Sequence, residues 1–278
     1  MQLDKNGNID AVKIKSVLIE ISKIFKSPAN NTILYMNLGK HLQEISFILD
    51  YSGDNQRILD IGGGLGVNLI AIKKILSKNS SLFLIDRFEE YETGNRMGGY
   101  EEGLDLLKNT GIEVVNQDFW ENKTLPFGSD LFDSVTIFDV TEHLPGSPLY
   151  LFREINRVLK PGGRIILGGP NSVYILRRIR LLLGNNPYIY FYDWISDRYY
   201  SHYREYSKNE QIELLKMTGF KDIKSVMSIE PSRTQAKNRY YYDSHQKFSL
   251  RTLLLYIVYI MEIINKNFRS TVYCIGKK

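Results

Sequence analysis

The residues best suited to chemistry in this chain lie in a glycine-rich stretch, ILDIGGGLG, at positions 58–66. Asp60 stands near the end of an apolar run, and glycines follow it at positions 62, 63, 64 and 66. Glycine at a turn between a strand and a helix lets a ligand approach the N–H groups at the helix N-terminus. Dinucleotide-binding turns have the pattern G-x-G-x-x-G, but here the third glycine is replaced by Val67 in one register and by Leu69 in the other. The stretch therefore predicts a ligand other than a dinucleotide, with a bare tight turn as the structural alternative.

Two further carboxylates stand at the ends of later apolar runs. Asp86 ends the run SLFLID, 26 residues after Asp60, where open α/β folds present a carboxylate to ribose hydroxyls. Such a carboxylate can accept one hydrogen bond on each oxygen from two neighbouring hydroxyls. Asp118 ends the run IEVVNQD and is followed by Phe119. The alternative is that Asp86 only caps the next helix and that Asp118 is a loop residue.

The runs that carry these carboxylates predict the scaffold that positions them. Short runs rich in Ile, Val and Leu alternate with segments of helical period, which favours a parallel sheet covered by helices on both faces. The expected strands are 57–61, 81–86, 112–118, 134–140 and 164–170. The expected helices between them are 67–76, 100–109 and 149–159, with a KPGG turn at 160–163 ending the last one. The predicted fold class is α/β and doubly wound.

The rest of the chain predicts a core with two insertions. The segment 171–206 is rich in tyrosine, and regular structure returns with a helix over 207–219 that has Ser207 and Glu210 in capping-box positions. The elements expected after it are a strand at 220–229, an irregular part at about 230–248, an apolar helix at 249–265 and a last strand at 270–276. We therefore expect four parts: an N-terminal helical segment (1–54), a cofactor-binding α/β core (55–170), an aromatic cap insertion (171–206), and the C-terminal part of the core (207–278) with a helical insertion at about 230–268.

The charge balance and the single cysteine exclude several classes of protein. A net charge of +5, from 36 basic and 31 acidic residues, is too small to indicate nucleic-acid binding. Cys274 alone makes neither an intrachain disulfide nor a cysteine-based zinc site, and it suits a reducing compartment. The most apolar run, 253–261, has nine residues, about half of a bilayer span, and no secretory signal is visible. We expect a cytoplasmic protein, for which a peripheral contact with a membrane surface stays open.

Five motifs, in order over roughly residues 55–172, resemble those of class I S-adenosylmethionine-dependent methyltransferases of the small-molecule, type 11-like group. They are D-x-G-x-G-x-G from Asp60, the strand ending in Asp86, NQDF at 116–119, LPFGSDLFDSVTIFDVTEHL at 125–144 and LYLFREINRVLKPGGRIILGGPN at 149–171. A looser agreement covers 202–220, with an aromatic–Arg–Glu–Tyr lead-in to the helix. The resemblance implies a mostly parallel, seven-stranded Rossmann-like sheet with a helical and aromatic cap, and S-adenosyl-L-methionine as the cofactor.

The resemblance also implies roles for individual residues. The glycines make room for the methionine part of the cofactor, and Asp60 orients the loop and the cofactor's amino group. Asp86 holds the ribose hydroxyls, while Asp118 and Phe119 contact the adenine amino group and ring face. The cofactor-binding residues expected on this basis are Asp60, Gly62, Gly63, Gly64, Gly66, Asp86, Arg87, Asp118, Phe119 and Asp139.

Methyl transfer from a sulfonium is an in-line displacement for which the cofactor carries the activation. The protein must align the acceptor and must take up a proton when the acceptor is a hydroxyl. His143, directly after the fourth strand, is the first candidate catalytic base because an imidazole titrates near neutral pH. His202 is the second candidate, and the alternative is that Glu142 and His143 only fix the turn. No metal ligand is predicted.

Acceptor specificity is expected in the aromatic cap insertion, because the sheet is occupied by the cofactor. Its tyrosines, with Phe191 and Trp194, form an amphipathic wall suited to sugar or aromatic rings, unless they are an aromatic lid packed on the sheet. The RRIR run at 177–180 is either an anion contact or a solvated helix face. The candidate substrate-binding residues are Tyr174, Tyr192, Trp194 and Tyr203.

These features favour a small-molecule acceptor. The FDVTEHL stretch at 138–144 differs from the Asp/Asn-Pro-Pro-aromatic motif of enzymes that methylate nucleic-acid amino groups, so no nucleic-acid partner is expected. The first hypothesis is O-methylation of a sugar, a glycan-type molecule or a lipid-linked acceptor. A quinone or polyketide-type acceptor, and a non-catalytic scaffold that keeps the cofactor pocket, are the alternatives. The oligomeric state is not indicated.

Overall fold

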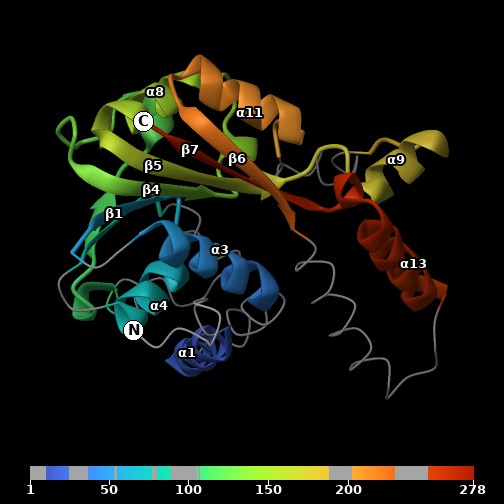
Figure 1. Cartoon of the computed structure of the whole chain (residues 1–278), viewed down its shortest axis with the longest axis horizontal. Coiled ribbons are helices and arrows are strands. Elements are labelled where there is room, and N and C mark those ends of the chain that lie inside the picture. Colours follow the sequence, from blue (N-terminus) through green and yellow to red (C-terminus); the bar gives the residue numbers. More distant parts are fainter. Residues whose placement is uncertain are drawn as a thin grey trace.

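The architecture is a single sheet between two layers of helices, with two further helices beyond one end of the sheet (Figure 1). This computed structural model describes residues 11–24, 37–52, 55–76, 80–88, 105, 107–187, 202–228 and 250–278. The predicted irregular part at about 230–248, most of the predicted helix at 100–109 and part of the aromatic cap insertion lie outside the described residues. No helix within the described ranges is long and apolar enough to cross a membrane.

The seven strands lie in the order β3-β2-β1-β4-β5-β7-β6. Their bounds are β1 Arg57–Ile61, β2 Ser81–Asp86, β3 Glu113–Asn116, β4 Phe132–Phe138, β5 Leu159–Pro170, β6 Lys221–Ser228 and β7 Thr271–Lys277. Strands β1 to β5 pair in parallel, whereas β7 is antiparallel to both β5 and β6. The order reverses between β1 and β4, which is the point where open α/β sheets bind ligands at the carboxyl ends of their strands. The predicted doubly wound, mostly parallel seven-stranded sheet is confirmed.

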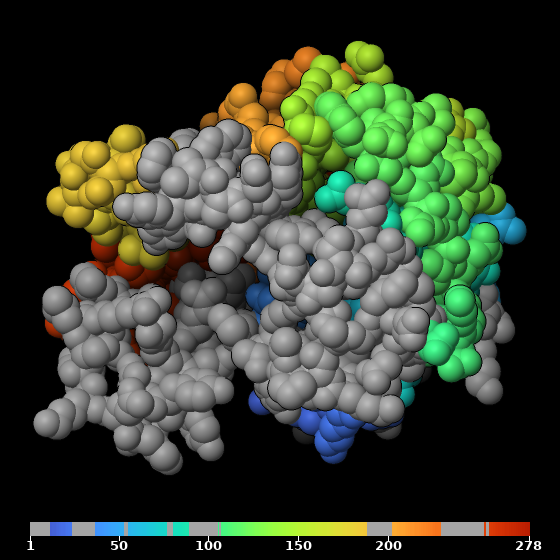
Figure 2. All heavy atoms as spheres, turned by 180° about the vertical axis from the view of Figure 1, so that it is seen from behind, coloured from blue at the N-terminus to red at the C-terminus, as the bar shows by residue number. Residues whose placement is uncertain are grey.

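Helices cover both faces of the sheet (Figure 1). One face carries α1 Ala11–Ile24, α3 Leu38–Tyr51 and α4 Val67–Ile75, and the other carries α8 Leu149–Val158 and α11 Lys208–Met217. The helices α9 Ile175–Leu182 and α13 Leu250–Ile264 pack against each other beyond the carboxyl end of β5. From behind, α9 (yellow) forms one extremity of the molecule, and the segment that includes β4 and α8 (green) forms the other (Figure 2). Short helices also follow β3 (α7 Phe119–Asn122), β4 (η1 Thr141–His143) and α13 (η2 Lys266–Phe268).

The apolar core is divided by the sheet into two clusters. Along β1, Ile58 belongs to the cluster under α1, α3 and α4, while Leu59 and Ile61 belong to the cluster under α8 and α11. This follows from the alternation of side chains along a strand, because successive residues point to opposite faces. All three are fully buried, so a strand that is apolar at nearly every position needs both helical layers.

Two local features show how the sequence sets the ends of elements. The predicted capping box at the start of α11 is present, since the Ser207 side chain accepts from the Glu210 N–H and the Glu210 side chain accepts from the Ser207 N–H. The KPGG segment differs from its prediction, because it lies inside β5 instead of ahead of the strand. There it forms a bulge, with Gly162 at φ +80°, while the partner strand β4 continues without the extra residues.

Candidate active site

The loop between β1 and α4 requires glycine for steric reasons. Gly62, Gly64 and Gly66 have φ of 69°, 55° and 67°, in the left-handed region that glycine adopts without strain. A Cβ atom on Gly62 would lie 2.3 Å from the Cγ2 of Val140, and one on Gly66 would lie 2.3 Å from the Cδ2 of Leu107. The loop is therefore packed closely against Val140 after β4 and against Leu107. Its glycines have no side chains in the turn that leads into the N-terminus of α4.

Asp60 is buried beneath this loop. Its Oδ1 accepts a hydrogen bond of 2.6 Å from the Thr136 hydroxyl, and its Oδ2 would lie 2.3 Å from a Cβ atom on Gly63. Burial raises the pKa of Asp60 to about 7, against the opposing effect of the hydrogen bond from Thr136. The negative charges of Glu44 and Asp86 raise it further. This placement fits the expected role of Asp60 in orienting the loop.

Asp86 connects the end of β2 to the same loop. Its Oδ2 accepts the N–H of Gly64 at 2.8 Å, and its Oδ1 accepts the N–H of Phe88 at 3.1 Å. Burial raises the pKa of Asp86, while these backbone hydrogen bonds lower it in part. An ionised carboxylate has about four acceptor positions, so both oxygens keep capacity for ribose hydroxyls. The ribose contact remains a prediction.

Asp118 serves as the N-cap of the one-turn helix α7. Its Oδ1 accepts the N–H groups of Trp120 at 2.7 Å and Glu121 at 3.2 Å. Its Oδ2 lies 3.8 Å from Nη1 of Arg87, which brings two of the expected cofactor residues together across the ends of β2 and β3. Phe119 is half-buried against the core cluster on the α8 side. The adenine contact of this pair stays a prediction.

Asp139 follows the last residue of β4 with an unusual backbone. Its φ of 52° lies in the left-handed region, which is uncommon outside glycine, although aspartate and asparagine adopt it more readily than most other residues. Its N–H donates to the carbonyl of Gly168 at 3.0 Å, and its carboxylate pairs with Lys40 from α3. Sequence reasoning missed Lys40, because nothing in the N-terminal segment indicates that α3 reaches the end of β4.

Three side chains meet beyond β4 and form what we term the Glu–His–His cluster: Glu142, His143 and His202. One nitrogen or oxygen from each lies within 4.8 Å of the others. The rings of His143 and His202 are edge to face, with centroids 4.8 Å apart. The two segments are joined by the backbone, since the N–H of Tyr203 donates to the carbonyl of Glu142 at 2.7 Å. The two histidines predicted as candidate bases from separate parts of the sequence are therefore neighbours.

Glu142 is the buried member of this cluster. The residue is 1% exposed, and its Oε2 has no hydrogen-bond partner among the described residues. Burial raises the pKa of Glu142, the nearby charges of His202 and Lys40 lower it, and that of Glu205 raises it. A buried carboxylate oxygen without a donor is costly, so this atom calls for a proton or a cation.

Glu205 contacts His202 and is itself paired with Arg177. Oε1 of Glu205 lies 2.5 Å from Nδ1 of His202 and also pairs with Nη2 of Arg177, the first arginine of the RRIR run. The Glu205 side chain is 3% exposed, so the ion pair is shielded from solvent. Sequence reasoning assigned no role to Glu205, although the aromatic–Arg–Glu–Tyr lead-in marked the segment. Arg177 is mostly shielded from solvent, with its side chain 14% exposed, and it pairs with Glu205.

The aromatic candidates for acceptor binding have different environments. Tyr174 is half-buried at the start of α9, with the Arg177 guanidinium 5.4 Å from its ring centroid. Tyr203 is 47% exposed beside the cluster. Tyr192 and Trp194 lie outside the described residues. The structure therefore brings Tyr203 close to the histidines, and the rest of the aromatic wall remains a prediction.

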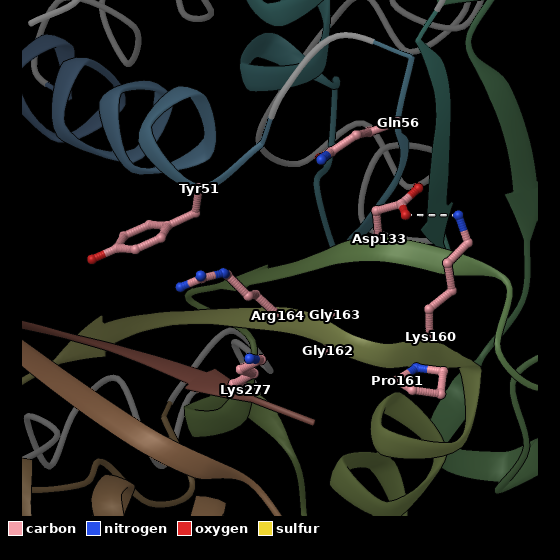
Figure 3. Close-up of a pocket in the computed structure, with 9 residues that line it drawn as sticks. All are labelled: Tyr51, Gln56, Asp133, Lys160, Pro161, Gly162, Gly163, Arg164 and Lys277. Carbon is pink, nitrogen blue, oxygen red and sulfur yellow. Dashed lines mark hydrogen bonds and ion pairs between the residues drawn. The ribbon is translucent and has the colours of Figure 1, made fainter. Parts of the chain in front are cut away.

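A separate cavity of about 280 Å³ lies near the amino ends of β4 and β5, at the opposite end of these strands from the glycine loop (Figure 3). It is formed around the KPGG bulge, where Asp133 at the start of β4 pairs with Lys160 at 2.6 Å. Arg164 points toward Tyr51 at its rim, and the guanidinium lies 5.1 Å from the ring centroid. The glycine loop and the cluster follow the carboxyl ends of the parallel strands, so this cavity at the amino ends is distinct from both.

Comparison with known proteins places the chain in a family. A family model described as a methyltransferase domain matches residues 36–225, which include strands β1 to β5, the glycine loop and the Glu–His–His cluster. The chain therefore belongs to the class I S-adenosylmethionine-dependent methyltransferases.

Solved structures with low sequence identity share this fold. Phosphoethanolamine N-methyltransferase 2 of Haemonchus contortus, in complex with S-adenosyl-L-methionine, aligns with a TM-score of 0.56 and 18% identity over 86% of this chain and 52% of that chain. A putative sarcosine dimethylglycine methyltransferase of Galdieria sulphuraria aligns with a TM-score of 0.55 and 15% identity over 95% of this chain and 98% of that chain.

Curated relatives match a shorter part. The ubiquinone/menaquinone biosynthesis C-methyltransferase UbiE of Vibrio vulnificus is 31% identical over 155 residues, which are 53% of this chain and 56% of the relative. The corresponding protein of Proteus mirabilis is 29% identical over 154 residues, with 53% and 57% covered. The chain thus spans about half the length of the curated relatives it matches.

Proposed function

We propose that this protein transfers a methyl group from S-adenosyl-L-methionine to an oxygen atom of a small-molecule acceptor. The observation that carries the proposal is the position of the Glu–His–His cluster, which begins two residues after Val140, and Val140 follows β4 and lies against Gly62 of the glycine loop. Acid–base side chains therefore stand beside a bare glycine turn. That combination suits the removal of a proton from an acceptor held next to a bound cofactor.

The cofactor site is proposed at the carboxyl ends of β1 and β2. The loop fits this group, because Gly62, Gly63 and Gly64 are only partly buried and have no side chains to cover their backbone. Asp86 offers acceptor capacity for hydroxyls, and Asp118 and Phe119 flank the next strand end. When bound there, the cofactor would supply a methyl carbon on a sulfonium, and transfer of that methyl group would leave the C–S electron pair on a neutral thioether.

The acceptor side of the reaction falls to the cluster. A lone pair of the acceptor hydroxyl forms the new C–O bond, and the hydroxyl proton must leave. His143 and His202 are the candidate groups for this step, because an imidazole takes up a proton near neutral pH and the two rings adjoin each other. Positioning contributes as well, since holding the oxygen about 3 Å from the methyl carbon removes much of the entropic barrier.

A sugar, glycan-type or lipid-linked acceptor is our first choice of substrate class. The exposed Tyr203 offers a ring face with a polar tip, which suits a sugar. At the end of α9, Leu181, Leu182 and Leu183 are 64%, 85% and 72% exposed, close to the basic RRIR run. An apolar surface with basic neighbours beyond the acceptor side is consistent with a lipid-linked molecule or a membrane surface. We also propose that the cap insertion, residues 171–206, sets this specificity.

Carbon methylation of a quinone ring is the second candidate. It is favoured by the similarity to UbiE of Vibrio vulnificus, described as a ubiquinone/menaquinone biosynthesis C-methyltransferase. A phenolic ring would also lose a proton, so the same histidines serve either acceptor.

One assay separates the two candidates. The purified chain is incubated with S-adenosylmethionine carrying a ¹³C-labelled methyl group and with panels of sugars, lipid-linked glycans and phenolic quinone precursors. The ¹³C chemical shift distinguishes an O-methyl from a C-methyl product. An O-methyl product supports the proposal and a C-methyl product supports the alternative. Failure to bind either S-adenosylmethionine or S-adenosylhomocysteine at millimolar concentration in calorimetry would contradict both.

A further inference from the structure

We infer that Glu142, His143 and His202 form a binding site for a divalent transition-metal ion. The site rests on the geometry of these residues, and only its part in methyl transfer rests on the proposed function. Two imidazoles and one carboxylate are a donor set that suits ions such as Mn²⁺, Co²⁺ and Zn²⁺. Three protein ligands leave coordination positions open for water or for an acceptor oxygen.

The cluster is compact enough to close on such an ion. Bonds from these ions to imidazole nitrogen or carboxylate oxygen are about 2.0–2.3 Å, so opposite ligands are separated by about 4.6 Å at most. One ligand atom of each residue already lies within 4.8 Å of the other two. Side-chain rotations that shorten these separations would close the cluster on an ion.

The buried Glu142 oxygen gives independent support. Its Oε2 lies 3.5 Å from the position of a Cβ atom on Gly169, so the absence of a side chain on that glycine leaves space beside the carboxylate. No described residue donates a hydrogen bond to this oxygen. A cation in the cluster would neutralise the carboxylate and satisfy the oxygen together, which no neutral ligand does.

His202 has the surroundings of a metal ligand. Histidines that bind metals commonly donate their second ring N–H to a carboxylate, which fixes the ring and its tautomer. Nδ1 of His202 lies 2.5 Å from Oε1 of the buried Glu205, whose position is fixed in turn by Arg177. A proton on Nδ1 leaves Nε2 with its lone pair available for the ion. This contact assigns Glu205 a positioning role for the ligand.

The ion also has a place in the proposed reaction. An acceptor hydroxyl bound at an open coordination position loses its proton more readily, because the cation stabilises the alkoxide. That proton passes to solvent water, and the oxygen stays held at the end of β4 beside the glycine loop. In the metal-bound protein the two imidazoles act as ligands and the cation assists the loss of the proton, whereas in the metal-free protein they stay the candidate bases of the proposed function.

The test is metal binding by the full chain after treatment with EDTA and dialysis. Calorimetric titration with Mn²⁺ should show one equivalent bound. Glu142→Ala, His143→Ala and His202→Ala should each weaken Mn²⁺ binding at least tenfold, and Glu205→Gln should weaken it about tenfold. His41→Gln is the matched control, because His41 lies on α3 with its Nδ1 bonded to Asn68, and it should bind Mn²⁺ like the wild type.

Two additional measurements make the result decisive. Binding of S-adenosylhomocysteine, measured in the same variants, reports the cofactor site separately, so failure of the methyltransferase proposal and failure of the metal site are distinguishable. Where a variant does not fold, pulsed electron paramagnetic resonance of the wild-type Mn²⁺ complex should show coupling to imidazole ¹⁴N. The absence of Mn²⁺ binding, unchanged affinity in folded cluster variants, or a complex without nitrogen coupling would each overturn the assignment.

Discussion

The two halves of the candidate site are built on different principles. The cofactor half, at the ends of β1 and β2, is defined by backbone: left-handed glycines, and the Asp86 carboxylate bound to N–H groups at 2.8 and 3.1 Å. The acceptor half, after β4 and at 202–206, is defined by side chains from distant segments, namely the Glu–His–His cluster with its Glu205 and Arg177 support. Under the proposed function, cofactor binding in the first half depends on loop shape, and the reaction in the second half depends on ionisable groups.

This difference separates the effects of substitutions. A change in the cofactor half should appear in stability and in cofactor affinity, because the loop is in contact with the core through Val140 and Leu107. A change at His143 or His202 in the acceptor half should appear in turnover, because both histidines are only half-buried and lie outside the apolar core. Four variants test whether this separation holds.

The largest effect is expected in the acceptor half. His143→Ala should lower kcat by about 10² to 10⁴-fold, the range typical for loss of an acid–base group in catalysis. The affinity for S-adenosylhomocysteine should change less than threefold, because His143 lies beyond Val140 and outside the loop. Steady-state kinetics and calorimetry on the same preparation measure both quantities. Unchanged turnover would show that His143 is not needed to remove the acceptor proton.

The next largest effect is expected in the glycine loop. Gly62→Ala places a Cβ atom 2.3 Å from Val140 Cγ2 at a positive φ, so we expect a loss of about 2–4 kcal/mol in the free energy of unfolding together with loss of cofactor binding. Urea denaturation measures the first and calorimetry the second. Gly128→Ala is the matched control, because nothing lies within 4 Å of its Cβ position and its φ is not positive, so stability should stay within about 0.5 kcal/mol. Equal stability of the two variants would contradict the steric account.

The same difference, between a half formed by local backbone and a half formed by distant side chains, explains which parts of the fold and site could be predicted from the sequence. The strands, their parallel pairing and the capping box were predictable, because apolar runs, helical period and capping residues are local signals. The arrangement of the glycine loop with Asp60 and Asp86 was predictable for the same reason, since Asp60 and the glycines lie in one stretch and Asp86 ends the neighbouring strand, and their cofactor contacts stay predictions.

The acceptor half was predictable only in part. The two histidines were identified separately, but their contact and the support from Glu205 depend on how residues 202–206 return to the end of β4. The pairing of Lys40 with Asp139 joins segments 99 residues apart and has no local signal. The KPGG segment was misplaced because glycine and proline indicate a turn but do not distinguish a loop from a bulge inside a strand.

A smaller effect is expected at Asp86. Replacement by Ala removes the acceptor of the Gly64 N–H and the expected ribose contact, and it should weaken S-adenosylhomocysteine binding by about 1–3 kcal/mol. Turnover at saturating cofactor should fall much less, in contrast to His143→Ala. Asp130→Ala is the control, because this exposed aspartate pairs with Lys278 away from the loop. An affinity equal to that of the Asp130 variant would remove the ribose assignment.

The smallest effect concerns the charge state of Asp60. Its folded-state pKa is raised to about 7, chiefly by burial, so below pH 7 the carboxyl is mostly protonated before the cofactor binds. The amino group of the cofactor is cationic at neutral pH and favours the ionised carboxylate, so binding should release a proton from Asp60. By linkage the affinity for S-adenosylhomocysteine should then fall as pH decreases below about 7, by at most tenfold per pH unit, or about 1.4 kcal/mol.

Asp60→Asn isolates this contribution, because the amide keeps the size of the side chain but cannot ionise. Its affinity should be lower than that of the wild type at pH 8 and should not change between pH 6 and 8. Calorimetry in buffers of different ionisation enthalpy should detect the released proton in the wild type and not in the variant. If the wild-type affinity is constant from pH 6 to 8, the ionised carboxylate has no part in binding. Asp60 then acts on the cofactor only through the shape of the loop above it, and the cofactor half depends on backbone geometry alone.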